Sequence, residues 1–288
     1  MRDQAQRLRE LARTRQAAGP VAADRARVLA VTSGKGGVGK TSLVANLAVA
    51  LSGRGRQVVV LDADFGLANL DILLNLNPAR NLGHLLRGEA RPEEIPVEVL
   101  PGLRVIPGAS GVEELADLDP AARERLVAEA GRLAAGAEFF LIDTAAGIGR
   151  NVVDLCAAAR EVWVVTNAEP TALTDAYGLI KVLWAREPEA RVGVVVNSAD
   201  DEAAARAVFG RLDEVVRRFL GRTVEWAGYV IRDEHVARAA RRQAAFVSAF
   251  PRSPAARCVQ ALADRLLGRE AEARGTGGFW RRLAGRDA

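Results

Sequence analysis

The sequence predicts an α/β fold with a mostly parallel central sheet and helices on both faces. Short apolar runs alternate with helical stretches along most of the chain. The central apolar runs are continuous rather than alternating, as in strands that are covered on both faces. A glycine-rich loop joins the first of these strands to the first helix of the body. With 288 residues, the chain is long enough for one large domain of this class.

The predicted elements follow in order along a single body, residues 28–268, in which we find no internal repeat. The expected strands are 28–33, 57–62, 103–107, 138–143, 161–167, 191–197 and 223–231. The expected helices are 40–52, 120–134, 149–159, 171–186, 201–219, 234–242 and 254–268. Residues 1–27 are expected to be a leader with a short helix at 3–16. Residues 269–288 are expected to be a flexible linker and an amphipathic helix.

Composition excludes several classes of protein. No apolar run approaches the roughly 18 residues of a membrane-spanning helix. The arginine-rich N-terminus lacks the apolar segment of a signal peptide. Cys156 and Cys258 have no C-x-x-C spacing, which argues against a zinc or iron–sulfur site and for a reducing cytosol. The excess positive charge lies at the two ends, so we expect acidic surfaces or partners there, and a body not built for nucleic acid.

The glycine-rich loop has the pattern G-x-x-x-x-G-K-[ST] between a strand and a helix, which is typical of a P-loop NTPase. Its backbone N–H groups and the helix N-terminus favour bound phosphate. Lys40 is expected to reach the β- and γ-phosphates, and the Thr41 hydroxyl is expected to bind Mg²⁺. The residues expected to bind nucleotide here are Gly34, Lys35, Gly36, Gly37, Val38, Gly39, Lys40, Thr41 and Ser42.

Lysine is rare in this chain, yet two of its three lysines lie in the same loop. The chain has 40 basic residues, and Lys35, Lys40 and Lys181 are the lysines among them. A compact ammonium fits between phosphates better than a guanidinium does. The loop resembles the K-G-G-x-G-K-[ST] signature of the deviant Walker A family, which includes the MinD and ParA ATPases, the nitrogenase iron protein and the arsenite-pump ATPase. The resemblance implies an ATP-bound homodimer in which Lys35 reaches the partner's nucleotide.

Two acids follow the second predicted strand, at Asp62 and Asp64. Spaced two apart at a strand's carboxyl end, they point to one side, next to the P-loop, where α/β sheets bind ligands. Carboxylates there can serve Mg²⁺ through its waters. The stretch resembles the D-x-D-x-G-L-x-N-L-D switch I segment of MinD-type ATPases. That resemblance implies that Asp64 orients the attacking water and Asp62 supports the metal's water shell.

The run Phe-Phe-Leu-Ile-Asp ending at Asp143 predicts a Walker B strand, whose carboxylate accepts from a Mg²⁺-bound water. No glutamate follows to act as general base, so we expect slow hydrolysis that dimerisation or a partner completes. The family often has proline at or near Ala145. Gly147 is expected to be the hinge that senses the γ-phosphate.

Two asparagines end later strands, at Asn167 and Asn197. By resemblance both lie near the base, where an amide can pair with adenine; Asn197 alone is also compatible with a turn residue. The N-K-x-D guanine signature is missing, which favours ATP over GTP.

The C-terminal stretch has the pattern of an interfacial membrane helix, with aromatic and aliphatic side chains on one face and arginines around it. The residues expected to touch lipid are Phe279, Trp280, Arg281, Arg282 and Leu283. One copy is expected to bind weakly and two copies in an ATP dimer far better. The chain would then be cytoplasmic and peripheral on the inner face of the membrane when loaded with ATP. The alternative is a helix packed on its own domain.

The leader distinguishes members of the family. Residues 3–9 resemble the D-Q-A-x-x-L-R leader of the FlhG (FleN/YlxH) group of MinD-like ATPases, which set flagellar number and position. By resemblance it stimulates an FlhF-like GTPase, and flagellar switch or C-ring proteins are further possible partners. The alternatives are a division-site MinD and a DNA-partitioning ATPase of the ParA type. The residues expected to contact the GTPase are Asp3, Gln4, Ala5, Leu8 and Arg9.

Overall fold

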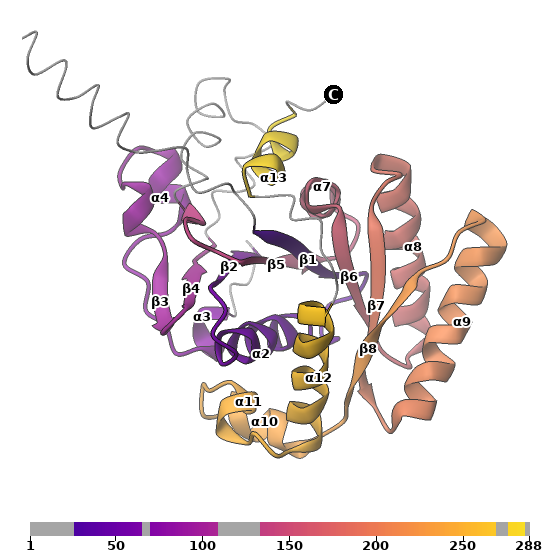
Figure 1. Cartoon of the computed structure of the whole chain (residues 1–288). Helices are drawn as coiled ribbons and strands as arrows, with labels where there is room; N and C mark the ends of the chain where they lie inside the picture. The colour runs from indigo at the N-terminus through magenta and orange to yellow at the C-terminus, as the bar shows by residue number, and fades with distance from the viewer. Residues whose placement is uncertain (1–25, 65–69, 109–132, 269–275, 286–288) are drawn as a thin grey trace, which may run out of the picture.

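A computed structural model describes residues 26–64, 70–108, 133–268 and 276–285 of the chain (Figure 1). The predicted leader helix and most of predicted helix 120–134 lie outside these residues. Eight strands form one sheet in the order β3-β4-β2-β5-β1-β6-β7-β8. Their bounds are β1 Arg27–Ser33, β2 Val58–Ala63, β3 Val97–Leu100, β4 Leu103–Ile106, β5 Phe139–Ala146, β6 Glu161–Thr166, β7 Arg191–Ala199 and β8 Glu225–Ile231.

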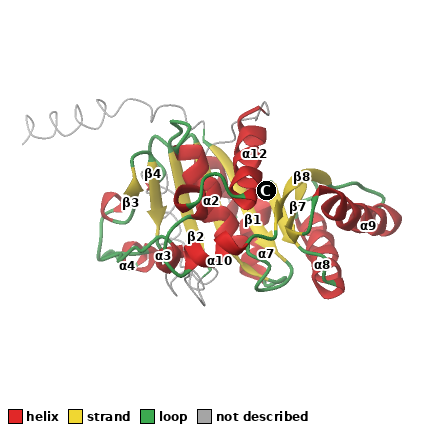
Figure 2. Cartoon of the chain, turned by 90° about the horizontal axis from the view of Figure 1, so that it is seen from below, coloured by secondary structure: helices red, strands yellow, loops and turns green. Residues whose placement is uncertain are grey.

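Helices cover both faces of the sheet, as Figures 1 and 2 show. One face packs on α4, α7, α8, α9 and α13, and the other on α2, α3 and α10 to α12. The bounds are α2 Lys40–Ser52, α3 Leu70–Leu73, α4 Leu82–Leu86, α7 Arg150–Ala159, α8 Pro170–Arg186, α9 Glu202–Leu220, α10 Glu234–Ala240, α11 Phe246–Ala249, α12 Pro254–Gly268 and α13 Thr276–Leu283, with a 3₁₀ turn at Pro92–Glu94. The predicted P-loop NTPase fold is therefore confirmed.

The central strands are buried on both faces, as the continuous apolar runs predicted. Every residue of β1, β2 and β6 is buried. Parallel pairing of β1 with β5 and β6, and of β2 with β5, brings the carboxyl ends of these strands to one edge of the sheet. The P-loop and the acid-bearing segments leave the sheet at this edge.

The edge strand β3 was not predicted. It pairs antiparallel with β4, across a turn at Pro101 and Gly102 in which Gly102 has a φ of 84°. Pro-Gly is suited to such a turn because proline fixes one φ and glycine allows a positive one. The alternation of Val97, Glu98 and Val99 was the signal in the sequence.

Helix α13 packs on its own domain in this structure, which is the arrangement that the sequence left open beside a lipid-facing helix. Phe279 and Trp280 are 0% and 1% exposed, with ring centroids 5.8 and 6.3 Å from that of Phe140. The Nε of Arg282 donates to the carbonyl of Ala158, at the end of α7, over 2.8 Å. Burial of each aromatic ring contributes up to about 3 kcal/mol, so the docked helix is favoured over a solvated one.

Candidate nucleotide-binding site

The loop between β1 and α2 has a backbone that only glycine adopts without strain. Gly37 and Gly39 have φ values of 79° and 90°, and Gly39 caps the N-terminus of α2. At Gly34, a Cβ atom would lie 2.2 Å from the carbonyl carbon of Asp175 in α8, so no side chain fits there. The spacing of the glycines thus sets both the turn and its close approach to α8.

Lys40 and Asp143 form a buried ion pair at the centre of the site. The Nζ of Lys40 lies 2.8 Å from Oδ1 of Asp143, and the two side chains are 6% and 0% exposed. Burial raises the pKa of Asp143, and Lys40 opposes that rise. The other oxygen, Oδ2, is buried and lacks a hydrogen-bond partner among the described residues. The predicted phosphate lysine and the predicted Walker B acid therefore meet, as a P-loop site requires.

Asp62 lies beside Asp143, because β2 and β5 pair in register at these two residues. Burial, and then the charge of Asp143, raise the pKa of Asp62 to about 7. The backbone N–H of Asp64 donates to Oδ1 of Asp62 over 3.1 Å. Asp64 is half-buried directly after β2, and residues 65–69 lie outside the described chain. Two buried, neighbouring carboxyl groups favour a cation between them and the phosphates.

The chemistry of these donors fits Mg²⁺. The Thr41 hydroxyl lies 3.5 Å from the Nζ of Lys40, which also pairs with Asp143. No group of three or more His, Cys, Asp or Glu side chains that could hold a metal is found in the described part of the chain. A site with one hydroxyl and acids acting through water suits an ion that keeps most of its waters. Thr41, Asp62 and Asp143 are the residues that would hold it.

The segment after β5 is anchored to the P-loop. The N–H of Gly147 donates to the carbonyl of Ser33 over 2.8 Å, and Gly147 has a φ of 96°. Ile148 follows with 57% of its side chain exposed, before α7 begins at Arg150. A glycine at a positive φ, bonded to the phosphate loop, has the geometry expected of the hinge.

Lys35 points away from the Lys40–Asp143 pair. Its Nζ lies 2.6 Å from Oε2 of Glu169 and 3.1 Å from Oγ1 of Thr171, at the start of α8. The hydrogen bond from Lys35 lowers the pKa of Glu169. Asn167 belongs to this cluster as well, since its Nδ2 lies 3.3 Å from Oε1 of Glu169. The sequence analysis missed Glu169 and Thr171, for which the Glu-Pro start of a helix was the available signal.

A hollow of about 320 Å³ lies beside the P-loop. Asn197 lines it and its Nδ2 donates to the carbonyl of Val38 over 2.7 Å. Asn167 and Asn197 directly follow Thr166 and Val196, which pair between the neighbouring strands β6 and β7, and of the two asparagines Asn197 lines this hollow. Four residues that the sequence analysis missed come from the junction of β8 and α10, some 190 residues beyond the P-loop. They are Arg232, Asp233, Val236 and Ala237.

Asp233 holds the junction between β8 and α10 in place through hydrogen bonds. Burial opposes its charge, but hydrogen bonds from Ala255 N, His235 N and the His235 ring lower its pKa to about 2. Its Oδ2 accepts from Ala255 over 3.0 Å, and Oδ1 lies 2.7 Å from Nδ1 of His235. One carboxylate thus ties β8, α10 and α12 together next to the hollow.

Comparisons with known proteins agree with this geometry. The CobQ/CobB/MinD/ParA nucleotide-binding domain family matches residues 29–246. The antiactivator FleN of Pseudomonas aeruginosa is 40% identical over 83% of this chain and 85% of its own length. The flagellum site-determining protein YlxH of Helicobacter pylori is 40% identical over 66% of this chain and 64% of its own length. MinD of Pyrococcus horikoshii, solved with Mg-ADP, superposes with a TM-score of 0.68 at 27% identity, over 86% of this chain and 99% of that one.

The described helices include none that is long and apolar enough to cross a membrane.

Proposed function

Because this chain belongs to the CobQ/CobB/MinD/ParA family of nucleotide-binding proteins, we propose that it is a MinD-type switch that dimerises on ATP and controls flagellar number or position. It is an ATPase of the MinD/ParA class, forming ADP and phosphate. The flagellar role rests on the similarity to FleN and YlxH, and on the leader motif. In this role hydrolysis serves timing rather than metabolism.

The observation that carries the proposal is the position of Lys35. Its ammonium is held by Glu169 at the surface, with 39% of the side chain exposed, while Lys40 alone faces the buried acids. An exposed ion pair of this kind contributes at most about 1 kcal/mol, so it is easily exchanged for a phosphate contact. We assign that contact to the nucleotide of a second copy, as the family signature implies.

The residues of the site then have separate roles. Lys40 exchanges Asp143 for the β- and γ-phosphates when ATP binds, and the loop N–H groups bind the phosphate oxygens. Bound Mg²⁺ supplies charge neutralisation next to Thr41, Asp62 and Asp143. Asp64 orients the attacking water, and Lys35 from the partner completes the positive charge around the γ-phosphate. Asn197 and the junction at Asp233 form the proposed base site.

Membrane binding requires α13 to leave its place on the domain. Phe279 and Trp280 are buried here, so this conformation does not offer them to lipid. Their neighbour α7 begins directly after the Gly147 hinge, so a movement of that hinge on ATP binding reaches the helix on which α13 packs. We propose that the ATP dimer releases two copies of α13, which bind lipid together through high effective concentration.

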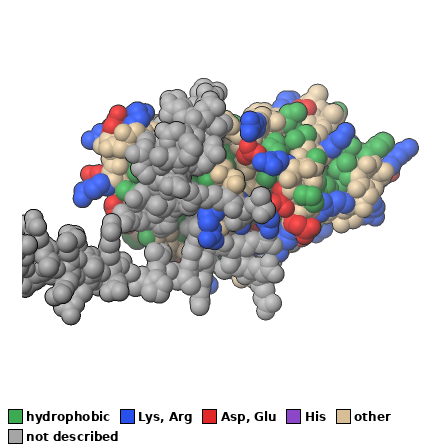
Figure 3. Space-filling model, turned by 90° about the horizontal axis from the view of Figure 1, so that it is seen from above, with side chains coloured by type: hydrophobic (Ala, Val, Ile, Leu, Met, Phe, Trp, Pro, Cys, Tyr) green, Lys and Arg blue, Asp and Glu red, His purple; other side chains and the backbone are tan. Residues whose placement is uncertain are grey.

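The partners follow from the two ends of the chain. Residues 2–16 are proposed to stimulate an FlhF-like GTPase, and flagellar switch or C-ring proteins are possible further partners. Asp and Glu side chains lie among Lys and Arg on the described part of the face in Figure 3, which does not favour a DNA-partitioning role. A division-site MinD remains the alternative within the same class.

The test is sedimentation of the full chain with and without ATP, repeated with liposomes and with naked DNA. We expect an ATP-dependent dimer that pellets with liposomes but not with DNA. Lys35→Ala is expected to remain monomeric and lose turnover, whereas Lys181→Ala, the third lysine of the chain, is expected to behave as the wild type. Binding to DNA alone, or a Lys35→Ala variant with normal turnover and assembly, would contradict the proposal.

A further inference from the structure

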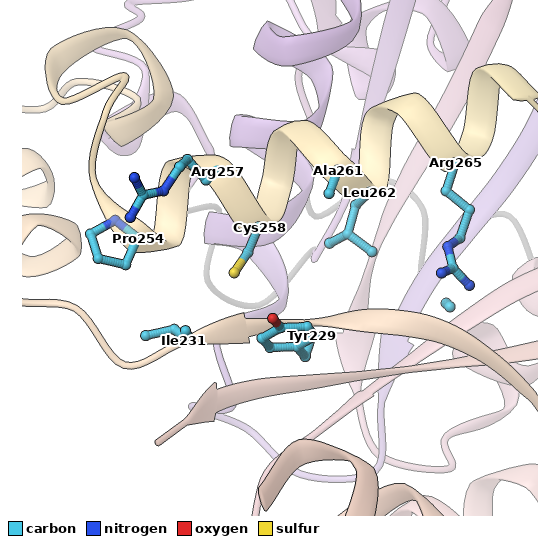
Figure 4. A pocket seen from close by; sticks show the side chains of 9 residues that line it. Tyr229, Ile231, Pro254, Arg257, Cys258, Ala261, Leu262 and Arg265 are labelled. Carbon is cyan, nitrogen blue, oxygen red and sulfur yellow. The ribbon is translucent and has the colours of Figure 1, made fainter. Parts of the chain in front are cut away.

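A second hollow, far from the phosphate loop in sequence, lies between the terminal strand β8 and helix α12. It has a volume of about 350 Å³ and runs beside the strand, as Figure 4 shows. We call it the β8 groove and define it by Tyr229, Ile231, Arg257, Cys258, Ala261 and Arg265. Neither the phosphate site nor the hollow at Asn197 uses these residues, apart from Ile231 at the shared end of β8.

Strand β8 ends the sheet. Among the described strands it pairs only with β7, so its second edge is not covered by a strand. The side chain of Arg265 donates to the carbonyl of Trp226 over 2.8 Å at this strand. A strand edge without a second strand beside it is a template for binding an extended segment of another chain, although here such a segment has to share the carbonyl of Trp226 with Arg265.

Strand β8, which forms one wall of the groove, is irregular at its middle. The pairing shifts so that Trp226 lies opposite Val194 while Gly228 lies opposite Val195, which makes Ala227 the extra residue of a bulge. Gly228 has a φ of 148°, and a Cβ there would lie 2.6 Å from a methyl carbon of Leu262 in α12. The helix therefore approaches the strand closely at this point.

The other side chains that line the groove are mostly apolar, and two arginines add positive charge. Cys258 and Tyr229 face one another across the hollow, between Arg257 and Arg265 on α12 (Figure 4). Among the described residues no carboxylate lines the groove, and the acids near it have partners: Glu202 pairs with Arg206 and lies 3.4 Å from the Tyr229 hydroxyl, Asp233 pairs with His235, and Asp264 pairs with Arg54. A guanidinium has five donors, so Arg265 can bind a carboxylate as well as the carbonyl of Trp226.

We propose that the β8 groove binds an extended acidic segment of a partner protein, which adds a ninth strand to the sheet. Arg257 and Arg265 are eight residues apart on a helix, which corresponds to about 12 Å. At about 3.3 Å per residue, a strand covers that distance in four residues, which also keeps both side chains on one face. The segment therefore carries two carboxylates four residues apart, with a small apolar residue between them that faces Cys258. This inference does not depend on the proposed flagellar function.

The experiment uses a fluorescein-labelled peptide, Thr-Glu-Val-Val-Val-Glu-Thr, titrated with the full chain and followed by fluorescence anisotropy. We expect a Kd of about 100 μM, and affinity at least about tenfold weaker when both Glu are replaced by Gln. A third peptide with the two Glu three residues apart, on opposite faces, is expected to bind as weakly as the Gln peptide.

Variants of the chain distinguish two contributions to peptide binding, the charge of the two arginines and the open space of the groove. The double change Arg257→Glu and Arg265→Glu is expected to abolish binding, and so is Ala261→Trp, which fills the hollow and keeps both arginines. Arg211→Glu is the matched control, because Arg211 is an exposed arginine on α9, on the other face of the sheet. Thermal melting of each variant verifies that it is folded, and hydrogen exchange of β8 amides is expected to slow when the peptide binds.

Three results would overturn the proposal. The first is the same affinity for the wild type and the doubly charge-reversed chain, and the second is no binding at about 1 mM peptide. The third is self-association in ultracentrifugation that the Ala261→Trp variant disperses, because the edge would then serve a second copy of this chain.

Discussion

The phosphate site and the docking site of α13 are linked to the two ends of α7, through Gly147 before its start and Ala158 near its end, and they are built in opposite ways. The phosphate site is polar, and it holds two adjacent buried acids of which one oxygen lacks a described partner. The α13 site is apolar, with Phe279 and Trp280 packed against Phe140. The buried carboxyl groups of the first site favour a cation and phosphates, whereas apolar packing dominates the second, even though Nε1 of Trp280 is buried there without a partner among the described residues. Nucleotide can therefore release α13 only if the free energy gained by ATP binding and dimerisation exceeds the free energy that keeps α13 packed on the domain.

Loss of the Lys40 ammonium is expected to have the largest effect of the changes proposed here, and the effect is on nucleotide affinity. Lys40→Ala removes the phosphate contact and leaves Asp143 buried without its cation. We expect nucleotide affinity to fall at least about a thousandfold, which corresponds to about 4 kcal/mol. Isothermal titration with Mg-ATP measures this loss, with Lys181→Ala as the control. Unchanged affinity would exclude Lys40 as a phosphate ligand.

Removal of an aromatic side chain from α13 is expected to lower the free energy of unfolding by a similar number of kcal/mol. Trp280→Ala deletes a side chain that is 1% exposed, so we expect the free energy of unfolding to fall by about 3–5 kcal/mol. Arg281→Ala, on the exposed side of the same helix, is expected to change it by less than about 0.5 kcal/mol. Denaturant unfolding of the nucleotide-free chain gives both values. Equal stabilities would mean that α13 is not docked in solution.

The two sites also differ in how far the sequence predicted them. The P-loop was predicted residue by residue because its glycines and its lysine act through local backbone geometry, as at Gly37 and Gly39. Helix α13 was expected with the right amphipathic pattern, but such a pattern does not say whether lipid or protein covers the apolar face. Arg232 and Asp233, which line the hollow beside the P-loop, were missed because only the folded sheet brings them next to that loop. Asn167 stays a prediction for the base site, and its amide lies 3.3 Å from Glu169, a neighbour that the sequence did not predict.

The pH dependence of stability tests the excess of buried acid at the phosphate site, measured on the nucleotide-free chain. Asp62 has its pKa raised to about 7 in the folded chain, by burial and then by Asp143, so the folded state holds its proton more tightly than the unfolded state does. Its contribution to stability is therefore lost as pH rises from about 4 to about 7. Asp62→Asn is expected to stabilise the nucleotide-free chain by about 2–4 kcal/mol at pH 8 and by less than half of that at pH 5. Denaturant titrations at both pH values decide this, and a change that is the same at both would contradict it.

The smallest effect is expected for a change at Glu169, which forms an exposed ion pair with Lys35. Glu169→Gln removes the carboxylate that holds Lys35 in its own subunit, and both side chains already face solvent. We expect a few-fold tighter ATP-dependent dimer, because Lys35 no longer has to leave an ion pair before it reaches the partner's nucleotide. Sedimentation equilibrium at several concentrations with Mg-ATP measures the dimer constant, and Glu138→Gln, which loses an exposed ion pair with Arg56, is the control. A weaker dimer in Glu169→Gln would mean that Glu169 itself contributes to the dimer interface. The ion pair between Lys35 and Glu169 would then persist in the dimer instead of breaking when the dimer forms.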